Sequence, residues 1–323
     1  MIPRQLRRDS QDANHHSNVW TDGRLDQDLG GDSVTSEEEW LHFPQVDVQQ
    51  ILVPWSDCLS VVLGPVQPDL VDEMKRRDFD YAPVFHSSDP RVGVLGLVSR
   101  RRLGELVSQG GQLTKDTPGV YHYQWYDGVS ARSDLDGLLR QMAERPVWIV
   151  EDEGDAGEEY GEIHVEYGIV TRSDLNKHPI RVIVYEVLAK LEMALADLVR
   201  EHLTNHLDWI RRLSEESQAR ILGYWELSKL QGVDLGPVVG ATLADLLNVL
   251  ARNENLRGRL GYDSRNAFED SVGGIAGVRN QTMHPVRPLV GSAESCTRLA
   301  DILKEAIRLT QRARSLREEA RSS

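Results

Sequence analysis

The chain has 323 residues, 40% of them hydrophobic and 27% charged, which is the composition of a soluble globular protein with room for two ordinary domains. No run of about 18 apolar residues occurs, so we expect a cytoplasmic protein without a membrane span. The net charge of −14 argues against a general nucleic-acid coat protein, but residues 1–179 hold 17 Lys and Arg against 32 Asp and Glu, whereas residues 180–323 hold 20 against 19.

Residues 1–45 lack periodicity and are rich in polar residues, which predicts a disordered or loosely packed arm that includes His15 and His16. From Val46 onward, short apolar runs alternate with helical patterns. Helices are predicted at 69–74 and from Ser99, and again at 133–139 and from Thr171, with strands at 81–85, 92–98, 146–150 and 165–170. The order helix, strand, strand, helix therefore occurs twice, at a period of about 70 residues.

After Pro179 the pattern is helical throughout, and no strand is predicted. The predicted helices cover about 180–206, 214–231, 240–253, 265–283 and 292–321. The sequence thus predicts an α+β multidomain protein, in which an α/β repeat module at 46–178 precedes an all-α domain at 179–323.

Each repeat contains a glycine, two apolar strand residues, a hydroxyl residue and a polar residue three positions later, at Gly96–Arg102 and Gly168–Asp174. A hydroxyl at a strand end and a carboxylate on the next turn can hold a ribose, while backbone N–H groups face a phosphate. The same residues can instead cap a helix, with Ser99 or Thr171 as the N-cap and Asp174 in the first turn.

Two copies in register resemble a pair of CBS domains, over about Val46–Lys177. The resemblance implies an adenine nucleotide ligand such as ATP or AMP, whose ribose and phosphate contact the hydroxyl and acidic residues. Thr171 and Asp174 match that pattern fully. Ser99 also matches, but Arg102 replaces the acid and would meet phosphate instead. We therefore expect the nucleotide to bind mainly at the second repeat.

The segment Arg279-Asn280-Gln281-Thr282-Met283-His284-Pro285 lies near the end of the helical half. Arg279 and His284 lie about 140° apart on an ideal helix, so both can reach a cleft between packed helices. Around a phosphodiester, His284 can transfer protons, Arg279 can stabilise the phosphate charge and Asn280 can orient either group. The alternative is structural: a histidine near a helix C-terminus and an arginine paired with a glutamate.

In its helical setting, the motif resembles the Arg-polar-x3-His signature of HEPN domains, over about Pro179–Leu316, although Val278 stands where Leu is frequent. The resemblance implies a homodimer in which two motifs line one cleft, and a metal-independent endoribonuclease that cuts RNA. It also suggests a stress-response or phage-defence toxin, with a separate antitoxin protein as a further option. A non-catalytic nucleotide-sensing regulator, whose helical domain binds RNA or a protein partner, is the alternative.

We predict no metal site. His202 and His206 have i, i+4 spacing with Asp208 nearby, but the glutamate that a zinc protease uses as its base is absent, so we interpret them as solvated helix-end histidines. Cys58 and Cys296 lie far apart and outside any CxxC motif, which excludes a cysteine-based metal cage and fits a reducing compartment.

Overall fold

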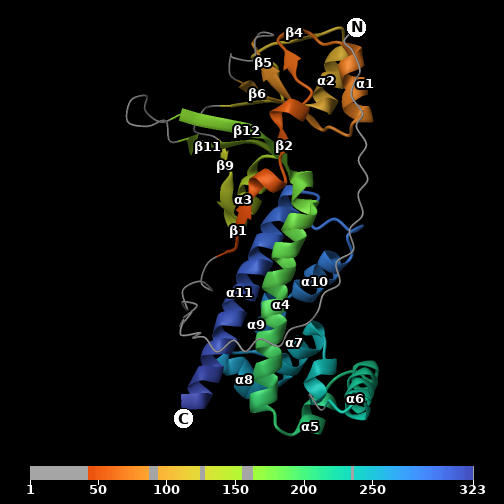
Figure 1. The fold of residues 1–323 in the computed structure, drawn as a ribbon, viewed down its shortest axis with the longest axis vertical. Helices are drawn as coiled ribbons and strands as arrows, with labels where there is room; N and C mark the ends of the chain where they lie inside the picture. The colour runs from red at the N-terminus through yellow and green to blue at the C-terminus, as the bar shows by residue number, and fades with distance from the viewer. Residues whose placement is uncertain (1–42, 87–93, 124–127, 155–162, 234–235, 323) are drawn as a thin grey trace, which may run out of the picture. The chain divides into compact units, whose positions relative to one another are not determined.

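The computed structural model describes residues 43–86, 94–123, 128–154, 163–233 and 236–322, all within one unit, Glu37–Ser323 (Figure 1). Of the predicted arm at 1–45, only the last three residues are among them, and His15 and His16 lie outside the described residues. None of the described helices combines the length and the apolar composition needed to cross a membrane.

The first repeat is built on a four-stranded sheet with the order β3-β5-β6-β8. Strands β5 and β6 are antiparallel, with Tyr81 opposite Ser99, and both helices of the repeat pack on a core that includes Met74 and Leu103. The elements are β3 (Val61–Val62), β4 (Gly64–Pro65), α1 (Pro68–Arg76), β5 (Tyr81–Phe85), β6 (Val94–Ser99), α2 (Arg100–Ser108), β7 (Gln112–Leu113) and β8 (Val120–His122).

The second repeat has the sheet order β2-β12-β11-β9, so strand β2 joins it from a position in the chain before the first repeat. The short strand β1 likewise pairs with β10. The elements are β1 (Gln45–Asp47), η2 (Val48–Gln50), β2 (Val53–Pro54), η3 (Trp55–Asp57), β9 (Val129–Ser130), β10 (Arg132–Asp134), α3 (Leu135–Glu144), β11 (Val147–Gly154), β12 (Ile163–Thr171) and η4 (Arg172–Asn176).

The predicted internal repeat is present, because α1-β5-β6-α2 recurs as α3-β11-β12-η4. The helix predicted from Thr171 is present as the short 3-10 helix η4, which has Thr171 as its N-cap and ends at Asn176. Pro179 explains this, since an α-helix cannot run through a proline that lacks the N–H and clashes with the preceding turn. Lys177 is extended and a new helix begins at His178.

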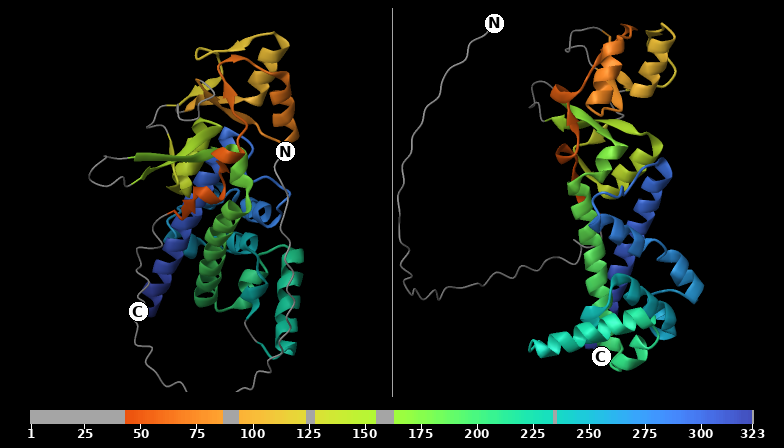
Figure 2. Two further views of the ribbon diagram at one scale, coloured as in Figure 1. Left: turned by 45° about the horizontal axis from the view of Figure 1, so that its top comes forward. Right: turned by 90° about the vertical axis from the view of Figure 1, so that its right-hand side faces the viewer.

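The C-terminal half is helical, as predicted. Helices α4 and α11 lie side by side and run in the same direction: Asn176 contacts Val290 at one end, and Glu201 contacts Arg317 at the other (Figures 1 and 2). The elements are α4 (His178–His202), α5 (His206–Ile210), α6 (Glu215–Leu230), η5 (Pro237–Gly240), α7 (Leu243–Arg252), α8 (Glu254–Arg259), α9 (Arg265–Ser271), α10 (Ile275–Met283) and α11 (Ala293–Ser322).

Two predicted helices are each divided in the structure. The helix expected at 180–206 ends at His202, and α5 begins at His206. The helix expected at 265–283 is split into α9 and α10 around Gly274, whose φ of +98° is left-handed and favours glycine. A β-carbon at Gly274 would lie 2.8 Å from Cδ1 of Ile302, so the Ile302 side chain would have to move to accommodate it.

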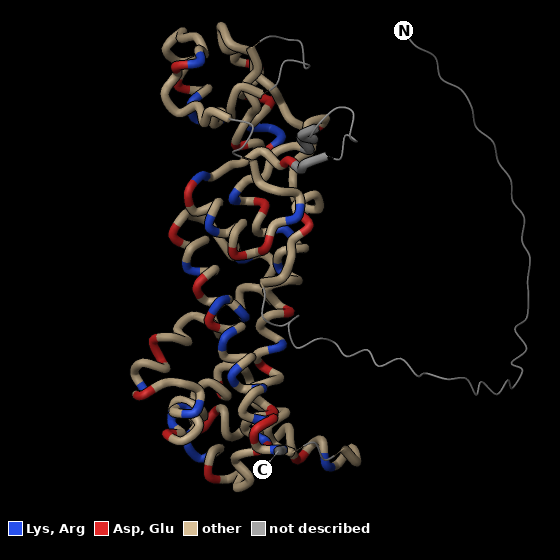
Figure 3. The backbone as a smooth tube through the Cα atoms, turned by 90° about the vertical axis from the view of Figure 1, so that its left-hand side faces the viewer, with Lys and Arg blue, Asp and Glu red and all other residues tan. Residues whose placement is uncertain are grey.

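The hydrophobic core does not follow the change from mixed to helical structure. One continuous cluster runs from Val46 in the second repeat to Leu316 in α11, whereas the first repeat has a cluster of its own. Helix α3 packs against α11, and Arg140 pairs with Asp301 at 3.5 Å. Both signs of charge are interspersed along the helical half (Figure 3). The second repeat and the helical half therefore share one packed interior.

Candidate functional site

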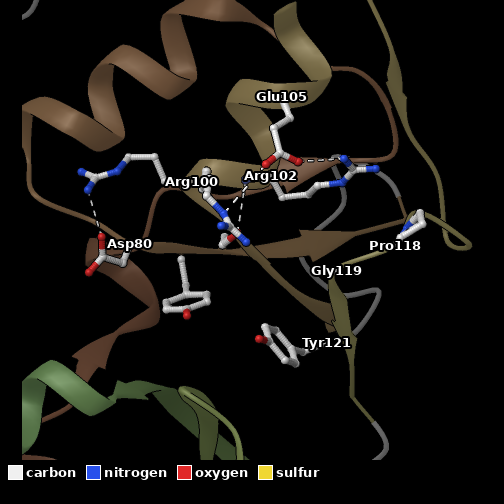
Figure 4. Close-up of a pocket in the computed structure, with 10 residues that line it drawn as sticks. Asp80, Arg100, Arg102, Glu105, Pro118, Gly119 and Tyr121 are labelled. Carbon is white, nitrogen blue, oxygen red and sulfur yellow. Dashed lines mark hydrogen bonds and ion pairs between the residues drawn. The ribbon is translucent and has the colours of Figure 1, made fainter. Parts of the chain in front are cut away.

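A pocket of about 640 Å³ lies in the first repeat, where β6 ends and α2 begins (Figure 4). It contains both residues that the sequence singled out in this repeat, Ser99 and Arg102. The remaining lining residues are Asp80, Tyr81, Arg100, Arg101, Glu105, Pro118, Gly119 and Tyr121.

The pocket is rich in arginine. Arg100 pairs with Asp80 at 2.9 Å and Arg102 with Glu105 at 2.9 Å (Figure 4). Three guanidinium groups against two carboxylates leave a net charge of +1. The Nε of Arg102 is buried and has no hydrogen-bond partner among the described residues. A buried donor without a partner is costly, whereas the net positive charge of the lining favours a bound anion.

Two tyrosines add an aromatic wall. The rings of Tyr81 and Tyr121 meet edge to face, with centroids 6.3 Å apart. Burial raises the pKa of Tyr81, so its hydroxyl remains a hydrogen-bond donor at neutral pH, while the charge of Arg172 acts on this pKa in the opposite direction. Because Arg172 begins η4, the second repeat lies within electrostatic reach of the pocket.

The two predicted nucleotide-binding hydroxyls both sit in helix caps. Ser99 Oγ accepts from the backbone N–H of Arg102 at 3.2 Å. In the second repeat, Oδ2 of the buried Asp174 accepts from the backbone N–H and the hydroxyl of Thr171, each at 2.6 Å, and its Oδ1 lies 2.8 Å from Nζ of Lys177. A ligand at Thr171 and Asp174 would have to replace one of these contacts.

The Arg-Asn-x3-His motif lies at the C-terminal end of α10. Arg279 is one-third exposed, with its Nε 3.7 Å from Oε2 of Glu192 on α4. Asn280 is exposed, and so is His284, which is the first residue beyond the helix. Within the described part of the chain, the side chains of Asn280 and His284 have no hydrogen-bond partner. The structure thus joins Arg279 to Glu192 and leaves the imidazole open to solvent.

Two residues that were not predicted, Asn176 and Arg181, hold the end of α10 and the segment that follows it. Both bond to the segment around His284, 100 or more residues further along the chain. Arg181 had a signal, because it interrupts the apolar run Ile180–Val184. Asn176 had none, since an asparagine at the end of a short helix is an ordinary turn residue. The aromatic wall of Tyr81 and Tyr121 was also not anticipated.

The two histidines with i, i+4 spacing do not form a metal site in the structure. His202 ends α4 and His206 begins α5, so the two do not share one helix, and the His206 ring lies 6.0 Å from Trp225. No group of three or more potential metal ligands occurs among the residues the structure describes. Burial raises the pKa of Cys58 to about 12, so this thiol stays protonated and is a poor nucleophile.

No family model and no curated protein matches the chain. Among solved structures, the CBS domain of a bacterial CNNM/CorC family Mg2+ transporter in complex with ATP is similar at 18% identity, over 40% of this chain and 84% of that one, with a TM-score of 0.28. CBSX2 in complex with AMP is similar at 17% identity, over 42% and 97%, with a TM-score of 0.29. Likenesses this weak add nothing to the argument from the repeat and its pocket.

Proposed function

We propose that this protein is a nucleotide-regulated, metal-independent endoribonuclease, with a CBS-type sensor module and a HEPN-type helical domain. The observation that supports the cleavage activity is the exposed C-terminal end of α10, which carries the one-third exposed Arg279 and the solvent-exposed Asn280 and His284. Arg287, exposed three residues further on, adds a second cation for an RNA phosphate.

The proposed reaction uses the RNA's own 2′-hydroxyl as the nucleophile. An imidazole of His284 takes the 2′-OH proton, the 2′-oxygen bonds to phosphorus, the bond from phosphorus to the 5′-oxygen breaks, and that oxygen receives a proton. Arg279 stabilises the charge that develops on the phosphate. The products are a 2′,3′-cyclic phosphate and a free 5′-OH, so no water, metal or external reductant is consumed in this step.

A homodimer fits this chemistry, because one imidazole can serve as base and the His284 of a second copy as acid. An exposed apolar stripe on α4 offers a contact surface: Val182 is 48% exposed, Tyr185 44% and Met193 58%. At about 100° per residue the three lie on one face, next to Glu192, the partner of Arg279. Stripes of this kind on a helix commonly mark interfaces.

The proposed dimer can be tested by introducing negative charges into the apolar stripe on α4. Tyr185→Glu combined with Met193→Glu should convert a two-chain mass into a one-chain mass in light scattering at micromolar concentration, because two buried carboxylates would face each other without partners. Leu230→Glu is the matched control, since Leu230 is 85% exposed on α6 and away from this stripe. A one-chain mass for the unaltered protein that still cuts RNA would reject the dimer.

For the sensor, we propose that an adenine nucleotide places its phosphates against Arg102 and its ring against Tyr81, near the Thr171 and Asp174 turn. Arg102→Ala should weaken ATP binding roughly 10-fold to 100-fold in calorimetry, as expected for a hydrogen bond to a charged group of about 1.5–3 kcal/mol. Arg76→Ala on α1 is the control, because Arg76 is exposed and outside the pocket.

The same calorimetric measurement shows which of the two repeats binds the nucleotide. If Asp174→Ala weakens ATP binding more than Arg102→Ala does, the second repeat holds the nucleotide, as the sequence pattern alone predicts. Equal ATP affinity in the unaltered protein, Arg102→Ala and a Thr171→Val/Asp174→Asn double variant would show that both turns are helix caps only.

A non-enzymatic regulator is the second candidate. The pairing of Arg279 with Glu192, and the lack of a hydrogen bond from the His284 ring within the described residues, favour it. RNA cleavage assayed with and without ATP and AMP decides between the two. No cleavage under any of these conditions would support a protein that senses nucleotide and presents its helical half to a partner.

A further inference from the structure

The irregular segment that follows His284 is held by one side chain of the second repeat. Asn176, the last residue of η4, accepts through Oδ1 from the backbone N–H groups of Leu289 at 2.6 Å and Val290 at 3.1 Å. Its Nδ2 donates to the carbonyl of Val290 at 2.9 Å. A single amide thus satisfies three backbone groups that no helix or strand would satisfy.

A buried arginine holds the same segment on both sides of His284. Arg181, in the first turn of α4, is only 7% exposed. It donates to the carbonyls of Asn176 at 3.0 Å, Gln281 at 2.9 Å and Arg287 at 2.5 Å. Gln281 and Arg287 stand three residues before and three residues after His284. The backbone that carries the exposed imidazole is therefore fixed from inside the protein.

The described partners of Arg181 are backbone carbonyls and none is a carboxylate. Burial of a guanidinium without a counter-charge is unfavourable, and three well-placed carbonyls offset that cost only while they stay in place. One of them, Gln281, is at the C-terminal end of α10, where the helix dipole is negative. Arg181 therefore favours one arrangement of the segment. Loosening the segment would leave a buried cation without its hydrogen-bond partners.

The other end of η4 is tied to the nucleotide turns. Thr171 precedes η4, and Asp174 within it is bonded to Thr171 and Lys177. Lys177 also donates to the carbonyl of Ile51. Arg172, at the start of η4, donates through Nε and Nη2 to the carbonyl of Met142 on α3 at 2.9 and 2.7 Å. A ligand that competes for Thr171 or Asp174, or that attracts Arg172, would shift a turn whose last residue is Asn176.

We propose that Asn176 and Arg181 are positioning residues that fix the backbone around His284 and connect it to the nucleotide-binding turns. This proposal rests on the proposed function. Nucleotide occupancy shifts η4, the bonds of Asn176 to Leu289 and Val290 change with it, and the placement of His284 follows. The repeats thereby set the cleavage rate without touching RNA.

The first experiment needs no RNA. Hydrogen exchange of the full chain is followed at the Leu289 and Val290 amides, with and without saturating ATP or AMP. We expect one nucleotide to change their exchange rates at least tenfold. Asn176→Ala should raise exchange at both amides and remove the nucleotide effect, and Asn176→Asp, which keeps the acceptor, should restore protection. Asn248→Ala, at an exposed position on α7, is the control.

Unchanged exchange at Leu289 and Val290 while calorimetry shows bound nucleotide would overturn the proposal, and so would the absence of nucleotide binding. The failure of the proposed function looks different: a nucleotide-dependent change in exchange with no RNA cleavage leaves this connection standing and removes the ribonuclease.

Kinetics give the second readout. Arg181→Met should lower kcat by about 100-fold, because a misplacement of about 1 Å can cost that much, and should leave KM for RNA within about twofold. A purely structural role would instead lower the folded fraction, and with it the total activity, at an unchanged specific rate per active site. If Arg181→Met does not fold, the Asn176 variants carry the same kcat test. Unchanged kcat in folded Asn176→Ala would overturn the proposal.

Discussion

His284→Ala is expected to reduce RNA cleavage by ~10²–10⁴-fold while the protein remains folded and dimeric. The imidazole is exposed beyond the end of α10, so its removal leaves no cavity and breaks no hydrogen bond of the described residues. A large loss of rate without a loss of stability would place His284 in the reaction rather than in the support of the fold. Initial rates on a labelled RNA, together with a thermal melt of the same sample, measure both quantities.

Two further observations belong to the same prediction. Cleavage should survive excess chelator, and an RNA in which every 2′-OH is replaced by hydrogen should resist it, because that hydroxyl is the nucleophile. His122→Ala is the matched control, since His122 is exposed on β8 of the first repeat. Activity that requires Mg²⁺ and persists in His284→Ala would remove the ribonuclease proposal and leave the regulator.

The phosphate-stabilising role of Arg279 can be separated from its charge. Arg279→Lys keeps the positive charge and can still approach Glu192, but an ammonium group does not offer the planar, two-pronged contact of a guanidinium to phosphate oxygens. Arg279→Lys should therefore lose most of the cleavage rate, whereas Asn280→Ala should lose less, because an orienting amide is more easily replaced by water.

The fold could be predicted from the sequence wherever the local sequence pattern determines the secondary structure. The change from a strand period to a helix period near Pro179 located the helical half, and the repeated turn located the two α/β units. The breaks at Gly274 and after His202 were missed, because apolar spacing continues across them while the backbone does not. A left-handed glycine against Ile302 depends on a neighbour from α11.

The candidate sites show the same limit. The residue types at Ser99, Thr171 and Asp174 were identified from spacing, but spacing cannot distinguish a cap from a ligand contact, and the structure shows all three in caps. The pocket at the first repeat depends on Tyr121, which β8 brings beside Tyr81 from 40 residues away. The contact of Arg181 with Arg287 spans more than 100 residues, and no local pattern encodes it.

The second large effect concerns the shared core. Leu138 on α3 is fully buried in the cluster that continues through α4 into α11. A buried Leu→Ala change typically costs about 2–5 kcal/mol. Because one interior serves both regions, Leu138→Ala should destabilise α11 as well as the second repeat, although it lies outside the helical half. Native-state hydrogen exchange of α11 amides in low denaturant measures this free energy directly.

Leu103→Ala in the first repeat is the comparison, because Leu103 is equally buried but belongs to the separate cluster of that repeat. It should accelerate exchange in α1 and α2 and leave α11 unchanged, since no part of its cavity borders the shared interior. If α11 exchange is unmoved by Leu138→Ala, the second repeat and the helical half are independent units despite their contact. Because the second repeat and the helical half share one core, a change of shape in one must affect the other. An equal loss of stability in the second repeat and in α11 would show that the two are coupled through this core, so that nucleotide binding at the second repeat can act on the helix that precedes His284.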